Sequence, residues 1–499
     1  MALAAIVLGA TTLMTPTSAA RGLGLESVMD ASRIVSEPQA LAKYAIHGIA
    51  PGSAAKPQSA QEAAEVVRFA ATEKLALIPC GNRTKLDLGA SPLRYDIALD
   101  LSALREIAHY DPADLTLSVD AGFPIAELNS KLFQHKQFIP LLTPFYSAST
   151  VGGTVAAGLD SPLRQFYGTA RDFLLGAEFI DGTGAQVKSG GRVVKNVTGY
   201  DLHKLLIGSL GSLAVITRLN FRTFPALMAG SCGFVVSFPT HEAALSLRRR
   251  IVDSPLSPLT LDVISPSTAR IFATRTPLTP EVPVFSGENH GAREIPLPLP
   301  GDWFHPQHWQ VCAAFAGASK VLDRYTRDLT RFAHDANASS ANFLDDSTRP
   351  SVWGRLREVI PLFRESSPAA SIFRLSFLPG YQAQAITVIE GVANAAELPV
   401  AFVARASGTI YVGLLPEIPG DVSHGEQMNA ATLEKLALLT QEIFALVRSR
   451  DGDAAMLFVP EALRTMPSVQ AAQAKISTLA PRIKSAFDPG NIFAPGRLA

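Results

Sequence analysis

Between residues 36 and 225, apolar and polar positions alternate in the way that is typical of short strands and amphipathic helices. Residues 59–62 (Ser-Ala-Gln-Glu) form a capping box, and the helical pattern AAEVVRFAATEK follows it. An apolar run at 75–79 predicts a buried strand. Two strand patterns flank Asp181-Gly182 and predict a hairpin, because Asp-Gly readily adopts the positive φ angles of a tight turn. Further strands are expected at 96–101, 115–120 and 138–142.

From about residue 228 the pattern changes. Strands are expected at 232–238, 309–315, 371–377 and 409–414, and helices at 241–252, 320–333, 382–395, 430–448 and 468–487. Strand–helix–strand units repeated in this way predict a second sheet with helices on one face. Seven prolines between 277 and 306, with few periodic apolar residues, predict a long surface excursion.

These patterns predict an α+β protein of two domains. The first domain is expected at 36–225, a cap domain with an antiparallel sheet at 226–420, and C-terminal helices that return to the first domain at 421–499. Residues 1–35 form a separate N-terminal segment. Its apolar stretch at 2–14 is too short to span a bilayer, and no Lys or Arg precedes it. A secretory signal and a frayed start are the two interpretations of that stretch.

Composition excludes several classes of protein. Of the 499 residues, 47% are hydrophobic and 18% charged, which excludes a disordered chain. Lys+Arg and Asp+Glu number 44 each, so the basic excess of a nucleic-acid-binding protein is absent. The low charge allows a large core and an apolar surface covered by a partner. Cys80, Cys232 and Cys312 form no Cys-x-x-Cys, so the chain does not supply the four thiolates of an iron–sulfur cluster, and cysteines this sparse fit a reducing compartment.

Three glycine-bearing segments carry the candidate chemistry. They are 79–84 (PCGNRT), 149–158 (STVGGTVAAG) and 199–213, which contains GYDL and GSLGSL. Glycine and small residues let consecutive backbone N–H groups point at one anion, and they let bare backbone approach a diphosphate. Taken singly, each segment also fits a simple tight turn, whereas together they favour a pyrophosphate site. No Rossmann fingerprint and no P-loop motif occurs.

The order of these motifs resembles the FAD-binding domain of the vanillyl-alcohol-oxidase/p-cresol-methylhydroxylase (PCMH-type) flavoproteins. The matching motifs are Pro-x-Gly-x-x-Thr at 79–84, STVGG-x-VAAG at 149–158, RDF-x-LG at 171–176, VKNV-x-GYDL at 194–202 and GS-x-GSL at 208–213. The segment 487–497 (FDPGNIFAPGR) is similar to the closing segment of that family, and KNVTGYDL at 195–202 most resembles the FAD-binding subunits of bacterial glycolate oxidases. The resemblance covers about 40–225 and 480–498, and it implies a PCMH-type FAD-binding domain of two subdomains at 36–225.

The resemblance also implies which residues bind FAD. Loop 79–84 is expected to hold the pyrophosphate, and Thr150, Gly152 and Gly153 to pass beside the isoalloxazine and phosphates. Gly208, Gly211 and Val215 are expected to line the adenine side through backbone contacts. The expected cofactor-binding residues are Pro79, Cys80, Gly81, Asn82, Arg83, Thr84, Ser149, Thr150, Gly152, Gly153, Ala156, Gly158, Gly208, Gly211 and Val215. No histidine lies in the pyrophosphate loop, so FAD is expected to be bound non-covalently. Asn82 and Arg83 replace glycines that are common in this loop, and Ala494 stands where relatives usually carry Asn, which predicts weaker FAD binding.

The sequence identifies no catalytic base. Members of the family that oxidise 2-hydroxy acids carry a His-rich metal-and-base motif in the cap, and the corresponding stretch here, 404–410, has no histidine. His305 and His308 have metal-ligand spacing but lie in the proline-rich excursion with no helix to align them, so no metal site is expected. Arg374 and Arg405 are candidates to anchor a carboxylate, and each also fits a salt-bridged sheet residue.

The expected protein is therefore an FAD-binding oxidoreductase: the FAD-binding subunit of a glycolate-oxidase-type dehydrogenase complex that acts on a small 2-hydroxy acid. The resemblance implies two partners, a catalytic flavoprotein subunit and an iron–sulfur subunit. The expected location is the cytoplasm, with membrane association through those partners. Two alternatives stay open: a stand-alone FAD-linked oxidase of another hydroxylated substrate, and a non-catalytic assembly scaffold that has lost FAD.

Overall fold

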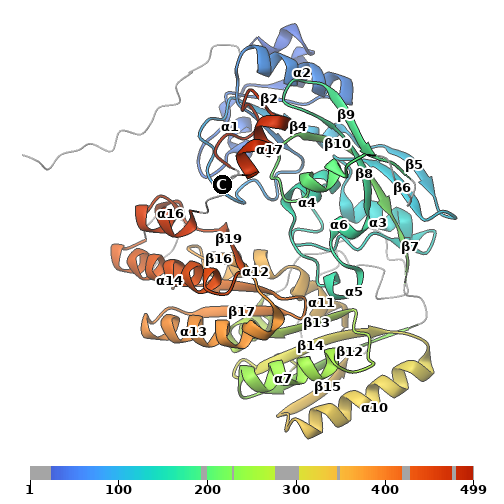
Figure 1. Ribbon diagram of the computed structural model, residues 1–499, viewed down its shortest axis with the longest axis vertical. Coiled ribbons are helices and arrows are strands. Elements are labelled where there is room, and N and C mark those ends of the chain that lie inside the picture. Colours follow the sequence, from blue (N-terminus) through green and yellow to red (C-terminus); the bar gives the residue numbers. More distant parts are fainter. Residues whose placement is uncertain are drawn as a thin grey trace, which may run out of the picture.

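The protein folds into two lobes, which Figure 1 shows one above the other. The computed structural model describes residues 24–192, 199–226, 230–275, 303–344, 349–417, 428–474 and 479–497. The apolar stretch at 2–14, motif positions 194–198 and most of the excursion at 277–306 lie outside the described residues. Within the described part, no helix is long and apolar enough to cross a membrane.

The first lobe contains two main sheets, as expected for two subdomains. One sheet has the order β1-β2-β4-β3, in which β2 (Ser53–Ala55), β4 (Ile97–Asp100) and β3 (Leu77–Cys80) run parallel. The other is antiparallel, with the order β5 (Ile107–Asp111), β6 (Thr116–Asp120), β10 (Val215–Arg222), β8 (Leu174–Ile180) and β9 (Gln186–Gly190). The expected helix α2 (Ala60–Thr72) begins after Ser59, whose hydroxyl accepts a hydrogen bond from the Glu62 N–H (3.1 Å). The Glu62 carboxylate accepts from the Gln58 N–H (2.9 Å), so the reciprocal half of the capping box is shifted by one residue.

This lobe begins earlier along the chain than residue 36. Strand β1 (Ile34–Val35) pairs antiparallel with β2. Leu25 and Met29 are buried in the same core as the apolar face of α2. The part of 1–35 that the structure describes is therefore integral to the lobe and not a separate segment.

The second lobe is built on one eight-stranded antiparallel sheet with the order β15-β12-β14-β13-β17-β18-β16-β19. Its strands are β12 (Ser231–Phe238), β13 (Thr260–Ile264), β14 (Trp309–Ala316), β15 (Ser340–Leu344), β16 (Ser371–Ser376), β17 (Val400–Arg405), β18 (Thr409–Leu414) and β19 (Asp453–Phe458). One face packs against α7 (His241–Val252), α10 (Ser319–Asp335), α13 (Gln382–Ala395) and α14 (Ala430–Arg448), which lie together at the bottom of Figure 1.

The other face of this sheet is also covered, unlike the one-sided arrangement that the sequence predicts. Helices α8 (Pro266–Thr274), α11 (Arg349–Arg357) and α12 (Val359–Ser366) share a single buried core with strand residues of this face and with the first lobe. Ile372 and Tyr411 of the cap lie in the same apolar cluster as Val151 and Phe221 of the first lobe. The two lobes are therefore joined by continuous apolar packing.

The expected return of the whole segment 421–499 to the first domain is wrong for most of its length. Helix α14 packs on α13 and α16 (Pro467–Gln473), and its apolar residues belong to the same buried core as the sheet face that α13 covers. Strand β19 is the edge strand of the cap sheet. Of the described residues in this segment, only α17 (Leu479–Phe487) and the tail that follows lie in the first lobe (Figure 1). There the tail pairs with β3: the Leu77 N–H donates to the Ile492 carbonyl (2.7 Å) and the Ala494 N–H to the Leu77 carbonyl (2.9 Å).

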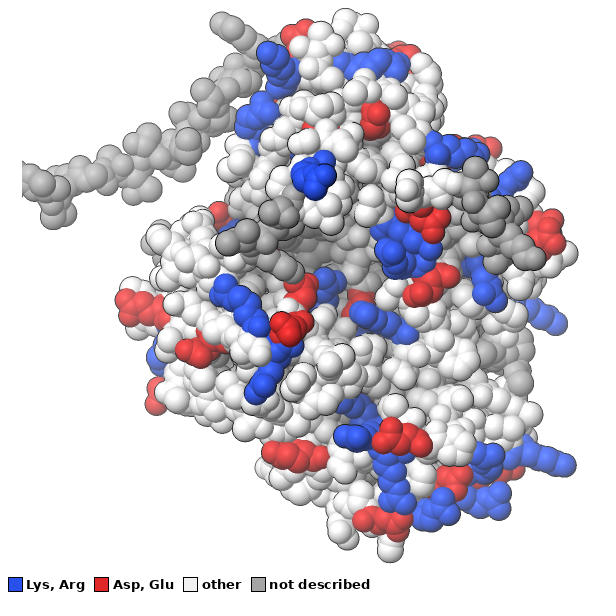
Figure 2. Space-filling model, viewed as in Figure 1, with Lys and Arg blue, Asp and Glu red and all other residues white. Residues whose placement is uncertain are grey.

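Charged side chains are scattered over a mostly uncharged surface on the face that Figure 2 shows. The two signs are mixed, and no extended patch of a single charge covers that face, in keeping with equal numbers of acidic and basic residues. This is unlike the basic surface of a nucleic-acid-binding protein.

Candidate functional site

A cleft in the first lobe brings the three glycine-bearing segments together. Its walls come from the end of β3 and the loop after it, from α4 (Val151–Ala157), from the turn before β10, and from the C-terminal tail. The expected residues that line it are Pro79, Cys80, Gly81, Asn82, Arg83, Thr84, Thr150, Gly152, Gly153, Ala156 and Gly211. Pro79 and Gly211, which lie 132 positions apart in the sequence, therefore belong to one site.

Glycine is required where the first two segments cross. A Cβ on Gly81 would lie 2.2 Å from the Thr150 hydroxyl oxygen, and a Cβ on Gly152 would lie 2.6 Å from the Ala121 Cβ. Both distances are shorter than any real contact between such atoms. These glycines bring bare backbone to the wall of the cleft, as a diphosphate site needs.

The segment 149–158 is mostly helical and not the open loop that the sequence predicts. Thr150 is the N-cap of α4, and its hydroxyl accepts a hydrogen bond from the Gly153 N–H (3.3 Å). The helix ends at Gly158, which has a φ angle of +60°.

The third segment is held against the first two by its backbone. Gly211 has a φ angle of +71°, and a Cβ there would lie 2.6 Å from the Pro79 Cγ. The N–H groups of Gly208 and Leu210 donate to the Val155 and Ala156 carbonyls, at 3.0 and 2.9 Å. Gly208 thus supports the cleft from behind and does not line it.

Three other expected residues also lie outside the lining. Val215 is fully buried in the core beside α2, and its neighbour Ile216 lines the cleft instead, because successive side chains of a strand point to opposite faces. Ser149 is buried directly behind the wall, and Gly158 faces a second cavity. The expected backbone contact of Val215 with the adenine side stays a prediction.

Three cations line the cleft, and no carboxylate does so among the described residues. Arg83 forms an ion pair with the buried Asp100 (2.8 Å) and lies over the Tyr44 ring. Lys85 and Arg497 are the other two, and neither is among the cofactor contacts expected from the sequence.

Lys85 is held in the wall of the cleft with its ammonium enclosed by protein, although part of its side chain is exposed. The ammonium donates to the Ser149 hydroxyl and, at 3.3 Å, to the Thr84 hydroxyl. Burial lowers the pKa of Lys85 to about 7, and the nearby Glu358 carboxylate on the cap opposes that effect. Glu358 is itself held by the Phe145 N–H (2.6 Å) of the first lobe.

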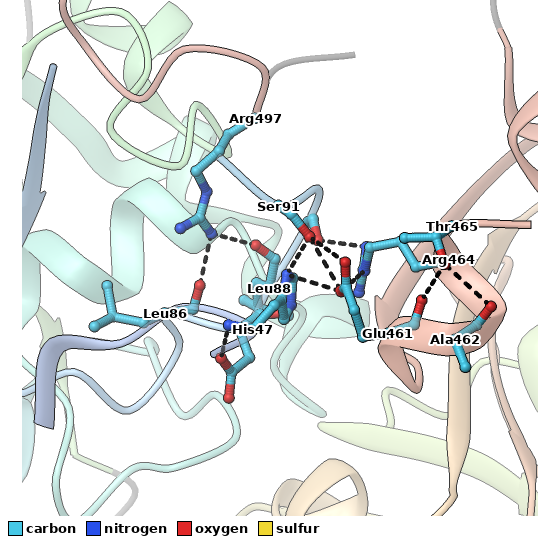
Figure 3. Close-up of polar contacts among 11 residues, drawn as sticks. His47, Leu86, Leu88, Ser91, Glu461, Ala462, Arg464, Thr465 and Arg497 are labelled. Atoms are coloured by element: carbon cyan, nitrogen blue, oxygen red, sulfur yellow. Dashed lines mark hydrogen bonds and ion pairs between the residues drawn. The ribbon is translucent and has the colours of Figure 1, made fainter. Parts of the chain in front are cut away.

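Arg497 enters the cleft from the C-terminal tail, and Figure 3 shows its guanidinium beside Leu86 and Leu88. Its Nη2 donates to the Leu86 carbonyl (2.7 Å) and to the Leu88 carbonyl. The side chain is only 4% exposed, and its Nε and Nη1 have no hydrogen-bond partner among the described residues. Burial lowers its pKa to about 10, so it stays cationic at neutral pH. A buried cation with two unused donors at a cleft wall fits an anionic ligand group such as a pyrophosphate.

Ala494 does not face the cleft. It is buried in a small apolar cluster with Ile78 and Cys80, and its N–H is used in the pairing with β3. Weaker FAD binding because of Ala494 therefore stays a prediction with no contact at the cleft to support it.

The two arginine candidates for carboxylate binding have different surroundings. Arg405, at the end of β17, is buried and forms an ion pair with the buried Asp262 (3.1 Å), so its charge is neutralised within the cap. This favours the structural interpretation of Arg405. Arg374 on β16 lines the second cavity, and its Nη1 donates to the Gly158 carbonyl (2.9 Å).

The fold and the cleft together define a flavoprotein architecture: an FAD-binding domain of two subdomains followed by a cap with an antiparallel sheet. Residues 51–190 match the family described as FAD binding domain. The structure resembles p-cresol methylhydroxylase with substrate bound, with a TM-score of 0.69 and 15% identity over 95% of each chain. It also resembles 4-ethylphenol oxidase from Gulosibacter chungangensis, with a TM-score of 0.67 and 14% identity over 95% of each chain. The expected α+β, PCMH-type fold and the FAD-binding domain are confirmed.

Curated relatives match less than half of this chain. The chain is 36% identical over 188 residues to glycolate oxidase subunit GlcE of Escherichia coli K12, covering 38% of this chain and 49% of the relative. It is 31% identical over 191 residues to a D-lactate dehydrogenase of Archaeoglobus fulgidus, covering 38% and 42%. It is 23% identical over 222 residues to glycolate oxidase subunit GlcD of Bacillus subtilis 168, covering 44% and 47%. The matches thus span about half or less of each of these relatives.

The protonation of Lys85 predicts how cofactor binding depends on pH. The charged ammonium attracts a phosphate, and a bound phosphate raises the pKa of Lys85, so FAD affinity is expected to fall as pH rises above about 7. The fall approaches about tenfold per pH unit. The stability of the FAD-free protein is expected to rise over the same range, because the folded state with its lowered lysine pKa binds fewer protons than the unfolded chain.

Fluorescence titration of FAD-free protein and thermal melts between pH 6 and 9 measure both trends. The control is Lys85→Met, which keeps the length of the side chain and removes the charge. Its FAD affinity is expected to be lower at pH 6 and to lose this slope. An equally steep slope in the Lys85→Met variant would assign the titration to another group.

Proposed function

We propose that this chain is the FAD-binding subunit of a glycolate-oxidase-type dehydrogenase complex that oxidises a small 2-hydroxy acid. The observation that carries the proposal is the contrast between the cleft and the cap. In the cleft, Gly81 and Gly152 bring bare backbone to the wall and three cations line it. In the cap, the hairpin at 404–410 contributes Arg405 to a buried ion pair and contains no catalytic base. The likeness to GlcE supports the same assignment.

The chain's own residues bind and orient the cofactor. Arg497 and Lys85 supply positive charge for the pyrophosphate, whereas Arg83 is paired with Asp100. Gly81 and Gly152 let backbone approach the pyrophosphate. FAD, when bound, would supply the hydride acceptor for oxidation of the substrate. The bond between the Asp160 N–H and the Tyr411 hydroxyl (3.3 Å) fixes the cap hairpin against the first lobe.

The same hairpin offers no group that accepts a proton at neutral pH. Burial raises the pKa of Tyr411 to about 12, so this hydroxyl stays protonated. Arg405 is neutralised by Asp262 and does not anchor a substrate carboxylate. These features support a subunit whose catalytic base comes from a partner.

We infer two partners, a catalytic flavoprotein subunit and an iron–sulfur subunit. The matches to both GlcE and GlcD support the first. The three cysteines support the second, because Cys80 and Cys312 are each buried within different lobes and do not approach one another as cluster ligands. A cytoplasmic location, with membrane association through these partners, follows from the same proposal.

The test is the colour of the protein with and without substrate. Purified alone, the protein is expected to show the visible absorption bands of oxidised flavin and to release FAD on acid precipitation, as a non-covalent cofactor does. Anaerobic glycolate is expected to leave these bands unchanged in the isolated chain and to bleach them once the catalytic subunit is co-purified.

Two other outcomes would point to the alternatives. Bleaching of the isolated chain by glycolate or another hydroxylated substrate would support a stand-alone oxidase. A colourless preparation with a cooperative thermal melt would support a scaffold that has lost FAD.

A further inference from the structure

The turn that begins at Phe145 lies between the cofactor cleft and the cap, and it binds a charged group on each side. On the cleft side, the Ser149 hydroxyl accepts a hydrogen bond from the Lys85 ammonium and donates one to the Phe145 carbonyl (2.6 Å). On the cap side, the Glu358 carboxylate accepts hydrogen bonds from the Phe145 N–H (2.6 Å) and the Tyr146 N–H (3.2 Å). The turn therefore connects the Lys85 ammonium to a carboxylate of the other lobe.

The backbone of this turn is shaped to hold that carboxylate. Phe145 has a φ angle of +63°, which residues other than glycine rarely adopt. This conformation lets two successive N–H groups converge on one anion, and each binds a different oxygen of Glu358. The centroid of the Phe145 ring lies 5.7 Å from the Lys85 ammonium and 5.9 Å from that of Phe458 on cap strand β19. Because such a backbone persists only where its surroundings hold it, the cap is part of what fixes the turn.

Glu358 is buried and attracts one cation from each lobe. It lies between α11 and α12, is 2% exposed, and accepts a hydrogen bond from Arg357 Nε (2.9 Å). The Arg357 guanidinium lies over the Tyr146 ring, 4.6 Å from its centroid. Burial raises the pKa of Tyr146 to about 12, so its hydroxyl, which accepts from Asn129 Nδ2 (3.0 Å), is uncharged at neutral pH. Arg357 of the cap and Lys85 of the first lobe are therefore the charges that act on Glu358.

Glu358 also affects the charge of the cofactor cleft. Burial lowers the pKa of Lys85 to about 7, and the Glu358 carboxylate is the charged group that raises it. The other two cations of the cleft are Arg83, which is paired with a carboxylate, and Arg497, whose pKa of about 10 keeps it charged at neutral pH. Lys85 therefore changes its charge near neutral pH, and that change depends on a carboxylate of the cap.

We propose that Glu358 is a positioning residue of the cofactor site: this cap carboxylate holds the turn at Phe145 and, with it, the Lys85 ammonium that faces the pyrophosphate. By its charge, Glu358 also favours the charged form of Lys85. The coupling is reciprocal, because a bound phosphate that keeps Lys85 charged also strengthens the attraction between Lys85 and Glu358, which holds the cap on the first lobe. This inference rests on the proposed contact between Lys85 and the pyrophosphate.

Fluorescence titration of the FAD-free, full-length protein with FAD tests the proposal. Glu358→Gln keeps the shape of the side chain and removes its charge. The fall of FAD affinity with rising pH is expected to begin about one pH unit lower than in the wild type. At pH 7.5 the variant is therefore expected to bind FAD about three- to tenfold more weakly, whereas at pH 6 the difference is expected to be about twofold or less.

A double variant and a matched control separate this role from a merely structural one. Once Lys85→Met has removed the ammonium, adding Glu358→Gln is expected to change FAD affinity by less than about twofold at either pH. The control is Asp262→Asn, which breaks another buried ion pair of the cap, that with Arg405 (3.1 Å), and does not line the cleft. It is expected to lower the melting temperature and to leave the pH profile of FAD binding in place.

Hydrogen exchange measures the reciprocal effect with Glu358 in place. In the wild type, saturating FAD is expected to slow exchange of the Phe145 and Tyr146 amides, which donate to Glu358, by at least about threefold. In Lys85→Met at saturating FAD, most of this additional protection is expected to be lost. Equal protection in the two proteins would contradict the coupling, even if Glu358→Gln did not fold.

The remaining outcomes are also decisive. An unchanged pH profile in Glu358→Gln, or an equal loss of affinity with and without Lys85, overturns the inference while the FAD site stands. If Lys85→Met itself leaves FAD affinity and its pH dependence unchanged, the proposed contact of Lys85 with the pyrophosphate is wrong, and the inference falls with it.

Discussion

Arg497→Met is expected to purify largely without FAD. The side chain is buried at the wall of the cleft with two unused donors, and a charge-assisted hydrogen bond contributes about 1.5–3 kcal/mol. Losing one or two such bonds corresponds to a loss of affinity of about tenfold to more than a thousandfold. The ratio of flavin to protein absorbance in the purified variant, and FAD titration of the FAD-free form, measure the effect.

The matched control is Arg464→Met. Arg464 is also a buried arginine near this loop, and its Nη1 donates to the Gly89 carbonyl (2.5 Å), but it does not line the cleft. Both arginines donate to backbone carbonyls of residues 86–89 and approach that loop from different sides (Figure 3). If both variants lose stability but only Arg497→Met loses FAD, the guanidinium acts on the cofactor. Equal FAD content in the two variants would show that Arg497 only holds the loop in place.

Gly153→Leu is expected to exclude FAD from a protein that still folds. A Cβ at this position meets only the Thr150 hydroxyl, at 3.1 Å, so the backbone tolerates a side chain there better than at Gly81 or Gly152. The added leucine would project into the space that the cofactor needs. We expect at least about a hundredfold loss of affinity, equivalent to about 2.7 kcal/mol, with a melting temperature close to that of the wild type.

The control for this variant is Gly391→Leu. Gly391 lies inside helix α13 of the cap, and a Cβ there has no atom within 4 Å. The same chemical change is therefore made at a helical glycine far from the cleft. Unchanged FAD content in Gly153→Leu would mean that the cofactor does not pass beside this segment.

Local patterns predicted the elements of this protein better than their assembly. Helices α7, α13 and α14 have the bounds that their apolar periodicity indicates, because each buries one continuous stripe against the cap sheet. Strand β19 was not predicted, since it begins with exposed and half-buried residues and buries only its last three. Because no strand is predicted after residue 414, the sequence gives no indication that α14 belongs to the cap.

The candidate site shows the same limit. Gly81 and Gly152 could be identified from the sequence, because glycine is the residue type that a close approach of bare backbone requires. Lys85 and Arg497 were not, because an arginine or lysine gives no local sign of where its charge will be buried. On β10 the side chain of Ile216, and not that of Val215, lines the cleft, because a motif identifies a strand but not which of two neighbouring side chains faces a cavity.

The C-terminal tail has a consequence for the order of events during synthesis. The Arg497 guanidinium reaches the carbonyl of a residue that lies 411 positions earlier in the chain. Gly81 and Gly152, which follow β3 and lie in α4, are synthesised long before Arg497. The Arg497 guanidinium joins the cleft wall only after the entire cap has been translated. Assembly of the complete cleft therefore follows translation of the cap, and a nascent chain that stalls within the cap lacks this part of the cleft wall.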